Sequence, residues 1–479
     1  MGHRLRSVPG PIWLLALWAL SFTPTAMPND TTSTNPANQL DAIVAGGIAG
    51  SPPLAGLQVL VLRGGEVAYE YAGGFARLAA DGAVPLGLEH KPRIASISKL
   101  VATVGLMRLV EQGRVDLDAD VSTYLGFTLR NPAFAATPIT LRQILSHTSS
   151  IRDAGRYWLE ADGNFKEFFL PGSEIYDDGA HFAAGVGQGP GAYFEYANLN
   201  FGIVAGVIER VSGQRFDRYM REAVLMPLGL QASYNVCDLS WKHPEDVATL
   251  YRKRDADEVW QPQGDWVAQL DDARFSCYYG RPPVARGEDP GEILPGYRPG
   301  SNPTLFSPQG GLRASARDLA EIARLLLNGG TLAGQRLVDP GTIDEMFTPQ
   351  WVFDPSLPNG NTAEGLAPDD PGYKPLFTAF GLSVQRVDLA EWGLAENPRQ
   401  LFGHLGEAYG LLGQFWIDPE SQYHNPVFAE DKKFVFYCNL GWRSALAADI
   451  AQKMGLADVC HIDGGFEAWK AAGGAVEAK

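Results

Sequence analysis

Ser96 and Lys99 lie three residues apart at the start of an apolar run, residues 100–110, and this placement constrains the fold more than any other feature of the chain. The apolar residues recur at helical spacing until Gly113, which predicts a helix buried on one side. Residues three apart share a helix face, so Lys99 reaches back toward the Ser96 hydroxyl. Free backbone N–H groups at a helix N-terminus also favour a developing oxyanion. The alternative for so short a motif is a capping serine beside a solvated lysine.

Tyr196 and Asn198 form a second candidate group. They follow a Gly/Pro-rich stretch, residues 187–191, and precede an apolar helical run that Gly213 closes. A tyrosine in this place accepts a proton if a cationic neighbour lowers its pKa, and Lys99 is the candidate neighbour.

A third candidate group lies at the opening of a predicted strand. His404, Gly406 and Glu407 come just before the apolar run 411–417, and small residues at a strand let a substrate approach. The place of His404 at the strand edge predicts a substrate contact rather than a packing role. His147 lies in a Ser/Thr-rich turn, and we interpret it instead as a residue that satisfies backbone groups.

These groups occur in the order found in a known family, and together they resemble its three signatures. The family is that of the penicillin-recognising serine hydrolases, in the class C β-lactamase-like branch with D-Ala-D-Ala carboxypeptidases, D-amino-acid peptidases and related esterases. The matching residues are Ser96-x-x-Lys99, Tyr196-x-Asn198 and His404-x-Gly406. Residues 93–95, 145–149 and 310–315 are also similar to that branch, and the resemblance covers residues 39–420.

The resemblance implies a serine hydrolase that cleaves an ester, amide or lactam through an acyl-enzyme on Ser96. Lys99 and Tyr196 would handle the proton of the nucleophile, and Asn198 would orient Lys99 and the substrate amide. The resemblance also implies an oxyanion hole made of the backbone N–H groups of Ser96 and Glu407. A non-catalytic peptidoglycan-binding module with the same cleft is an alternative. The expected partner is a small-molecule or peptide-like acyl substrate, which the sequence does not name.

The third signature departs from the family pattern, which is commonly Lys-Thr-Gly. Here the sequence is His404-Leu405-Gly406. A lysine is charged at neutral pH, whereas a histidine with a pKa of about 6.5 is mostly neutral. This weakens the recognition of a substrate carboxylate, and it favours esterase or peptidase activity over β-lactamase activity.

The fold expected from both pattern and resemblance is α+β. Residues 57–62 and 67–71 predict a hairpin joined at residues 63–66. Helical patterns dominate from Ser96 to about Asn328, and strand patterns return after residue 379. One predicted helix, over residues 315–327, opens with a capping box. The resemblance implies an antiparallel sheet built from both chain ends, with a helical subdomain inserted and the active site in the cleft between them.

Composition limits the class of protein and of partner. The chain has 479 residues, 45% of them hydrophobic and 20% charged, which is ordinary for globular domains. Its net charge is −16 and there is no dense cluster of Lys and Arg, so nucleic acid is not an expected ligand. The histidines show no metal-binding spacing, and we expect neither metal nor cofactor.

The N-terminus predicts export. Basic residues precede an apolar run, residues 12–22, that is too short for an ordinary membrane span. We interpret residues 1–26 as a signal peptide and residues 27–38 as a linker, which places the protein in the periplasm or outside the cell. Pro24 makes the cleavage site imperfect, so an uncleaved N-terminal anchor is the alternative. No other membrane segment is expected.

Cys237 and Cys277 flank a long polar insertion, residues 238–276. In an exported protein a disulfide between them would close this loop and stabilise the fold by about 4 kcal/mol. The alternative is a pair of buried thiols.

Residues 421–479 resemble the C-terminal half of a rhodanese-like sulfurtransferase domain. A predicted strand, residues 434–437, leads into Cys438, with Arg443 close behind at the start of a predicted helix. A thiol between a strand and a helix N-terminus, beside an arginine, has a lowered pKa and carries a persulfide sulfur in that family. Sulfurtransferase activity is therefore a second hypothesis, although the early segments of that domain are missing.

The same tail has a second possible role. In the family that residues 39–420 resemble, a strand after the third-signature strands joins the N-terminal hairpin to the rest of the sheet. Without such a strand the hairpin keeps an unpaired edge. We therefore predict that residues 434–437 pair between the strands at 57–62 and 411–417. The alternative is a free-standing tail whose apolar strand is exposed and prone to aggregation.

Overall fold

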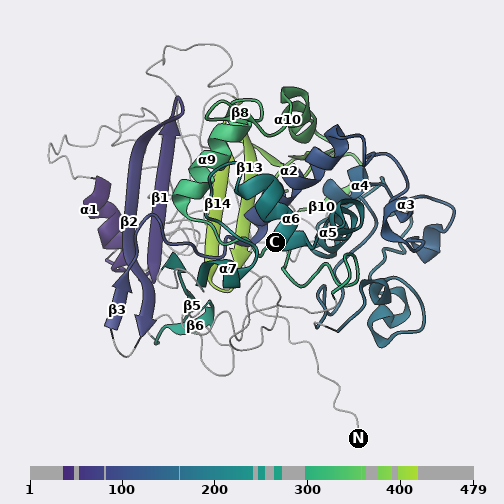
Figure 1. Ribbon diagram of the computed structural model, residues 1–479, viewed down its shortest axis with the longest axis horizontal. Helices are drawn as coiled ribbons and strands as arrows, with labels where there is room; N and C mark the ends of the chain where they lie inside the picture. Colours follow the sequence, from purple (N-terminus) through teal and green to yellow (C-terminus); the bar gives the residue numbers. More distant parts are fainter. Residues whose placement is uncertain are drawn as a thin grey trace, which may run out of the picture.

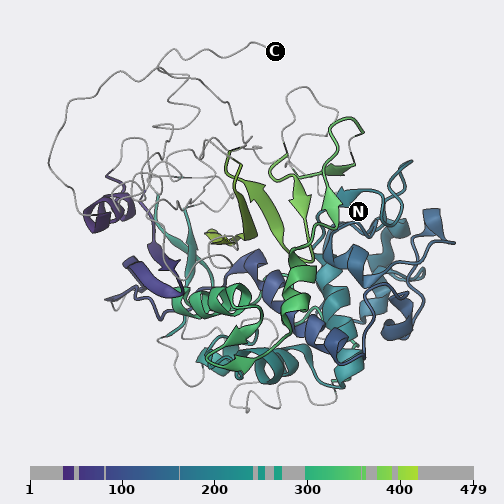
Figure 2. The ribbon, with the colours of Figure 1, turned by 90° about the horizontal axis from the view of Figure 1, so that it is seen from above.

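The computed structural model describes residues 36–47, 53–79, 82–160, 162–240, 246–253, 261, 264–271, 297–357, 359–362, 375–390 and 398–418. These residues form a mixed α/β structure in which the two larger antiparallel sheets lie toward one side and most of the helices toward the other (Figures 1 and 2). The predicted α+β class is confirmed.

The N-terminal hairpin forms as predicted. Strand β1 (Gly56–Arg63) pairs antiparallel with β2 (Glu66–Ala79), and the turn between them uses two glycines in the left-handed region. Strand β2 continues to pair with β3 (Gly82–Pro85). Helix α1 (Pro36–Val44) packs against β2, where Asp41 accepts a hydrogen bond from the Tyr71 hydroxyl at 2.8 Å. The first three residues of α1 belong to the predicted linker, and a proline suits the first turn of a helix.

The second sheet has five strands in the order β14-β13-β12-β11-β9, and all its neighbours are antiparallel. The strands are β9 (Trp351–Val352), β11 (Ala379–Phe380), β12 (Gln385–Asp388), β13 (Gln400–Ala408) and β14 (Leu411–Ile417). Strand β13 carries the third-signature residues, and its pairing with β14 places His404 opposite Phe415.

The two sheets do not pair with each other within the described residues. One edge of β1 and one edge of β14 have no strand partner there. Helix α9 (Ala316–Leu327) packs against both β1 and β14 and lies between them in Figure 1. Its predicted capping box is present, formed by Ser315 and Asp318. The strand at residues 434–437 that we expect between the two edges lies outside the described residues.

Two central helices form the core of the helical part. Helix α2 (Ser98–Glu111) and helix α5 (Leu199–Ser212) pack against each other, and each is followed by a glycine with positive φ, as predicted. Residues 98–107 are all buried, so α2 is enclosed on nearly every side rather than on one. The helices packed around α2 also cover the face that the sequence pattern does not predict to be buried.

Shorter elements complete the described fold. The helical ones are η1 (Ala95–Ile97), α3 (Ser122–Leu125), η2 (Pro132–Phe134), α4 (Leu141–Leu145), η3 (Phe165–Phe168), η4 (Glu174–Gly179), α6 (Phe216–Met220), η5 (Arg221–Leu225), α7 (Val236–Ser240) and α10 (Pro340–Phe347). The strands are β4 (Phe194–Glu195), which pairs with β10 (Gly360–Asn361), β5 (Leu250–Arg252) with β6 (Val267–Leu270), and β7 (Thr331–Leu332) with β8 (Gln335–Arg336).

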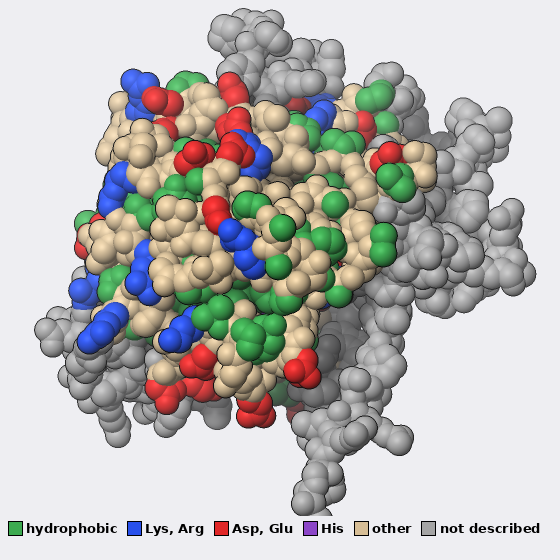
Figure 3. All heavy atoms as spheres, turned by 90° about the vertical axis from the view of Figure 1, so that its right-hand side faces the viewer, with side chains coloured by type: hydrophobic (Ala, Val, Ile, Leu, Met, Phe, Trp, Pro, Cys, Tyr) green, Lys and Arg blue, Asp and Glu red, His purple; other side chains and the backbone are tan. Residues whose placement is uncertain are grey.

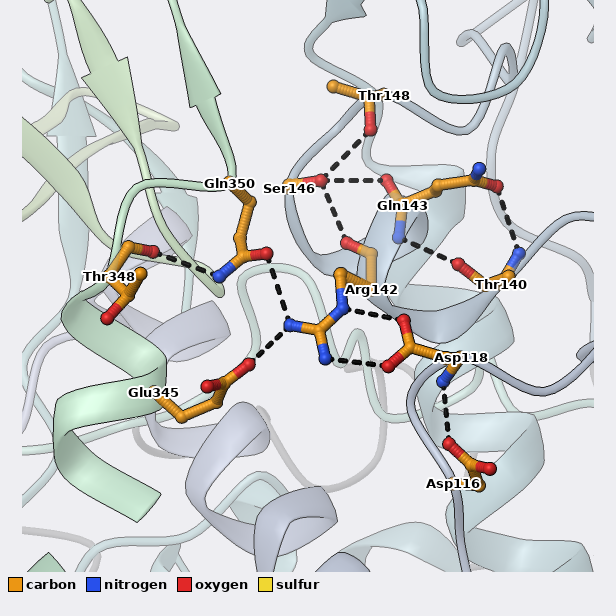
Figure 4. Close-up of polar contacts among 10 residues, drawn as sticks. All are labelled: Asp116, Asp118, Thr140, Arg142, Gln143, Ser146, Thr148, Glu345, Thr348 and Gln350. Carbon is orange, nitrogen blue, oxygen red and sulfur yellow. Dashed lines mark hydrogen bonds and ion pairs between the residues drawn. The ribbon is translucent and has the colours of Figure 1, made fainter. Parts of the chain in front are cut away.

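Arg142, in α4, fastens the helical part to the five-stranded side (Figure 4). Its Nε and Nη2 atoms donate to the two carboxylate oxygens of Asp118 at 2.6 and 2.8 Å. Its Nη1 atom pairs with Glu345 of α10 and donates to the side chain of Gln350, next to β9, at 3.1 Å. A planar guanidinium that engages a carboxylate with two bonds fixes orientation as well as distance. Helix α4 is thereby held directly before the turn that carries His147.

The face of the molecule in Figure 3 carries acidic, basic and apolar side chains, with several basic ones toward its left side and several acidic ones along its lower edge. Within the described residues, no helix has the length and apolar character needed to cross a bilayer. No group of three or more His, Cys, Asp or Glu side chains in that part of the chain is arranged to hold a metal ion.

Candidate active site

Ser96 lies in η1, the single helical turn that leads into α2. The preceding residue, Ala95, has φ +49°, a conformation that non-glycine residues adopt only where the surrounding structure enforces it. The neighbouring segment is held in place because the N–H of Ile94 donates to the carbonyl of Leu312 at 2.9 Å. Ser96 itself is half-buried, whereas both neighbours are buried, so its hydroxyl is the accessible group of this turn.

Lys99 is fully buried and has three oxygen partners. Its Nζ donates to Ser96 Oγ at 2.9 Å, to Asn198 Oδ1 at 2.8 Å and to the backbone carbonyl of Gln309 at 2.9 Å. It makes no ion pair with a carboxylate in the described part of the chain. Burial without a counter-ion lowers the pKa of Lys99 to about 7, while the charge of Asp153 opposes the shift. The structure thus brings Ser96, Lys99 and Asn198 together as the sequence predicts.

Tyr196 lies beside Lys99 in a different way from that predicted. The amine lies 4.8 Å from the centroid of the Tyr196 ring, so it contacts the ring face. The hydroxyl is buried and has no hydrogen-bond partner of good geometry within the described residues. Burial raises the pKa of Tyr196 above its ordinary value, and the neighbouring Ser96 hydroxyl only partly opposes this. The pKa of Tyr196 is therefore raised rather than lowered as expected, because burial of the hydroxyl disfavours the charged phenolate.

His404 is buried in β13, 6.1 Å from Tyr196 between ring centroids. Its Nδ1 bonds to the carbonyl of Leu405. A carbonyl can only accept, so Nδ1 carries the proton and Nε2 is left as an acceptor. Nε2 is buried without a partner in the described part of the chain. Burial, and secondarily the charge of Lys99, lower the pKa of His404 to about 3.

The ring of His147 packs against the ring of Tyr196. The two rings stack with centroids 4.3 Å apart. His147 Nδ1 accepts a hydrogen bond from the N–H of Ala197 at 3.1 Å, and the Asn200 side chain lies 3.2 Å from the same nitrogen. His147 has φ +56°, and the turn around it is closed by Ser146, whose hydroxyl donates to the carbonyl of Arg142 (Figure 4). The interpretation of His147 as a partner of backbone groups agrees with these contacts.

Gly406 allows β13 to approach η1. A Cβ atom at Gly406 would lie only 2.6 Å from the carbonyl oxygen of Ile94, which is closer than real Cβ contacts. Strand β13 packs against η1, and this brings Glu407 to the same end of the strand as the turn that carries Ser96. Glu407 itself is exposed.

Two groups at the site carry no signal in the sequence. The carbonyl of Gln309 holds Lys99, and the carboxylate of Asp153 accepts from Asn198 and from the first N–H of α5. A backbone carbonyl has no residue-type signature, although Gln309 directly precedes the matched stretch 310–315. Asp153 follows the matched stretch 145–149 by four residues, and only the folded chain shows that it meets α5.

The predicted cysteine sites are described only in part. Cys237 is fully buried and disulfide-bonded. Cys277, its predicted partner, lies outside the described residues. So do Cys438 and Arg443, the residues of the alternative sulfurtransferase site.

Comparison with known proteins decides the family. A model of the family described as Beta-lactamase matches residues 40–448. The chain belongs to the Beta-lactamase family. The match extends past residue 420 and includes residues 434–437 of the predicted rhodanese-like tail.

Curated relatives within the Beta-lactamase family include an esterase and a peptidase. Esterase EstB of Burkholderia gladioli is 28% identical over 267 residues, which cover 52% of this chain and 65% of EstB. The D-alanyl-D-alanine-carboxypeptidase/endopeptidase AmpH of Escherichia coli (strain K12) is 31% identical over 147 residues, 30% of this chain and 36% of AmpH. The matched stretches therefore span less than two thirds of either relative.

Solved structures share the Beta-lactamase family fold. The octameric penicillin-binding protein homologue from Pyrococcus abyssi superposes with a TM-score of 0.51 at 22% identity, covering 77% of this chain and 68% of that one. The D-amino acid amidase from Ochrobactrum anthropi SV3, complexed with D-phenylalanine, also gives 0.51, at 20% identity over 81% of this chain and 88% of the amidase.

Proposed function

We propose that this protein is a serine hydrolase that cleaves uncharged acyl substrates, with a preference for esters, through an acyl-enzyme on Ser96. The observation that carries the proposal is the set of contacts at Lys99, whose amine has Ser96 Oγ, Asn198 Oδ1 and the Gln309 carbonyl as partners at 2.8 to 2.9 Å. An uncharged amine has two N–H groups and one lone pair. With the two N–H groups engaged by Asn198 and Gln309, the lone pair points at the Ser96 hydroxyl.

Acylation then follows from the charge states of the site. Lys99 has a pKa of about 7, so near neutral pH a large fraction is uncharged and accepts the Ser96 proton while Oγ bonds to the acyl carbon. Tyr196, whose pKa is raised, is a phenol at this pH and gives its proton to the leaving oxygen as the bond from that oxygen to the acyl carbon breaks. The Lys99 ammonium then restores the phenol by way of a water, because the amine faces the Tyr196 ring and not its hydroxyl. A water repeats the sequence, adds its oxygen to the acyl carbon and releases Ser96 with its proton.

His404 argues for substrates without a carboxylate at the third signature. With a pKa of about 3 it is neutral at physiological pH, and its free Nε2 atom is a hydrogen-bond acceptor. A carboxylate placed there would meet a lone pair rather than a cation, and would lose its hydration. A primary amide can instead donate an N–H to Nε2, whereas an ester, which has no donor, leaves Nε2 to a water. The name of one relative, an esterase, fits this range of acyl substrates.

The test is a substrate panel run on the wild type, Ser96→Ala and Ser98→Ala. The panel holds a neutral p-nitrophenyl ester, a D-amino-acid amide and a chromogenic cephalosporin that bears a carboxylate. We expect the neutral ester to have the highest kcat/KM and Ser96→Ala to abolish turnover. Ser98 is the control, because its hydroxyl accepts from the N–H of Leu312 at 3.1 Å and does not contact Lys99. Turnover that survives in Ser96→Ala, or a preference for the cephalosporin, contradicts the proposal.

A further inference from the structure

Asp153 makes three hydrogen bonds at the start of α5. Its Oδ2 atom accepts from the backbone N–H of Asn198 at 2.9 Å and from the side-chain amide of Asn198 at 2.8 Å. Its Oδ1 atom accepts from the N–H of Leu199 at 2.9 Å. The carboxylate therefore caps the helix from a loop that is distant in the sequence.

The remote cap frees the Asn198 side chain. Asn198 is the residue at the helix N-cap, yet its own side chain makes no capping bond. Asp153 instead accepts from the amide nitrogen, and this fixes which end of the amide is which. The oxygen then points the other way, to Lys99 Nζ at 2.8 Å. Asp153 is linked to Lys99 by two hydrogen bonds in series, through the Asn198 amide. It thus decides the orientation of an amide that Lys99 contacts directly.

The amide orientation decides where the Lys99 lone pair points. If the Asn198 amide turned over, its NH₂ group would face the amine, and an uncharged Lys99 would turn its lone pair toward that group and away from Ser96. The fixed acceptors at Asn198 and Gln309 exclude this arrangement. A carboxylate that accepts only can hold the amide this way, because it offers no donor to compete with the backbone N–H groups.

We propose that Asp153 is a positioning residue for acylation: through the Asn198 amide it directs the lone pair of Lys99 to Ser96. The inference rests on the proposed function, since it assigns Lys99 the role of base. Asp153 also acts through its charge, which raises the pKa of Lys99 against the effect of burial. The other titratable groups around the amine, Tyr196, His147 and His404, have pKa values that burial shifts toward their uncharged forms.

The experiment compares Asp153→Asn with Asp318→Asn in the full chain. Asp318 is the matched control, because its carboxylate caps α9 with bonds to the Ser315 N–H and hydroxyl. The readout is the rate of Ser96 labelling by a neutral fluorophosphonate across pH, together with Tm. The acid limb of this pH–rate profile is the range in which the rate falls as Lys99 becomes protonated. For Asp153→Asn we expect labelling to be about tenfold slower or more at pH values above the acid limb. We also expect the midpoint of the acid limb to move to lower pH. Asp318→Asn should lower Tm without moving either quantity.

Two further variants keep the inference falsifiable. At pH values above the acid limb, where Lys99 is uncharged in both variants, Asn198→Ala and the double variant Asp153→Asn/Asn198→Ala should label at equal rates, because Asp153 positions Lys99 through the Asn198 amide. If Asp153→Asn does not fold, Asp153→Glu keeps the charge but displaces the carboxylate, and it should label slowly with an unshifted midpoint. The inference is overturned if the rate losses of the two single variants multiply in the double variant. It is also overturned if an Asp153 variant that folds is labelled at the wild-type rate. A wild type that is not labelled at Ser96 overturns the proposed function instead.

Discussion

The amine of Lys99 lies over the ring of Tyr196, 4.8 Å from its centroid, while the Tyr196 hydroxyl is buried and raised in pKa. The two residues therefore have different roles in proton transfer. Lys99 is poised to take a proton from Ser96, and Tyr196 holds a proton that it can give.

Tyr196→Phe tests that division. The variant cannot protonate a leaving group, so a substrate with a poor leaving group should suffer most. We expect kcat/KM for an alkyl ester to fall about 100-fold or more, and for a p-nitrophenyl ester, whose leaving group departs as an anion, to fall by about tenfold or less. Equal losses on both esters would mean that Tyr196 acts on the nucleophile instead.

His404→Lys tests the proposed preference for uncharged substrates. A lysine supplies a cation where the wild type has a neutral acceptor, so kcat/KM for carboxylate-bearing esters should rise while that for neutral esters changes little. The pKa of His404 is about 3, so the wild type is uncharged throughout the neutral range. The gain should therefore be present at about pH 6 as well as at about pH 8. The control is His404→Gln, which adds no charge and should give no gain; a similar gain from both variants removes the charge argument.

Gly406→Ala tests the close approach of β13 to η1. The new Cβ would lie 2.6 Å from the Ile94 carbonyl, and backbone cannot yield as a side chain does. Displacing β13 by about 1 Å should cost about 100-fold in kcat. Gly413→Ala is the matched control on β14, since the nearest contact of its Cβ would be the end of the Ile97 side chain at 3.3 Å, with no backbone atom closer than 3.7 Å. If both alanines have the same effect on kcat, the approach does not position the site.

Cysteine mapping tests the predicted bridge and, with it, the predicted export. Cys237 is buried and disulfide-bonded. We predict that non-reducing peptide mapping after oxidative expression finds Cys237 joined to Cys277. Disulfides persist in oxidising compartments, so the bridge supports our proposal of a periplasmic or secreted protein. A free thiol at both positions, or a bridge from Cys237 to another cysteine, would remove that support.

Local patterns in the sequence predicted local structure well. The hairpin at 57–71, the ends of α2 and α5 at glycines, and the capping box of α9 depend on residues close together in the chain, and all are confirmed. Spacing also placed Ser96 and Lys99 in contact, because an i to i+3 relation is a property of a single helix.

Features that depend on distant packing were beyond the sequence. The amphipathic pattern of α2 could not show that surrounding helices cover its other faces. The pKa of Tyr196 depends on how deeply its hydroxyl is buried, and local sequence does not show that burial. Asp153 is an unremarkable residue in a loop until α5 is brought against it.

The central claim is that Ser96 is an activated nucleophile, and intact-mass analysis after treatment with a neutral fluorophosphonate tests it most directly. We predict a single adduct on the wild-type protein, mapped by peptide sequencing to Ser96, with a labelling rate that falls as pH drops below about 7 because Lys99 becomes protonated. An unmodified mass, or an adduct on any other residue, would contradict the account.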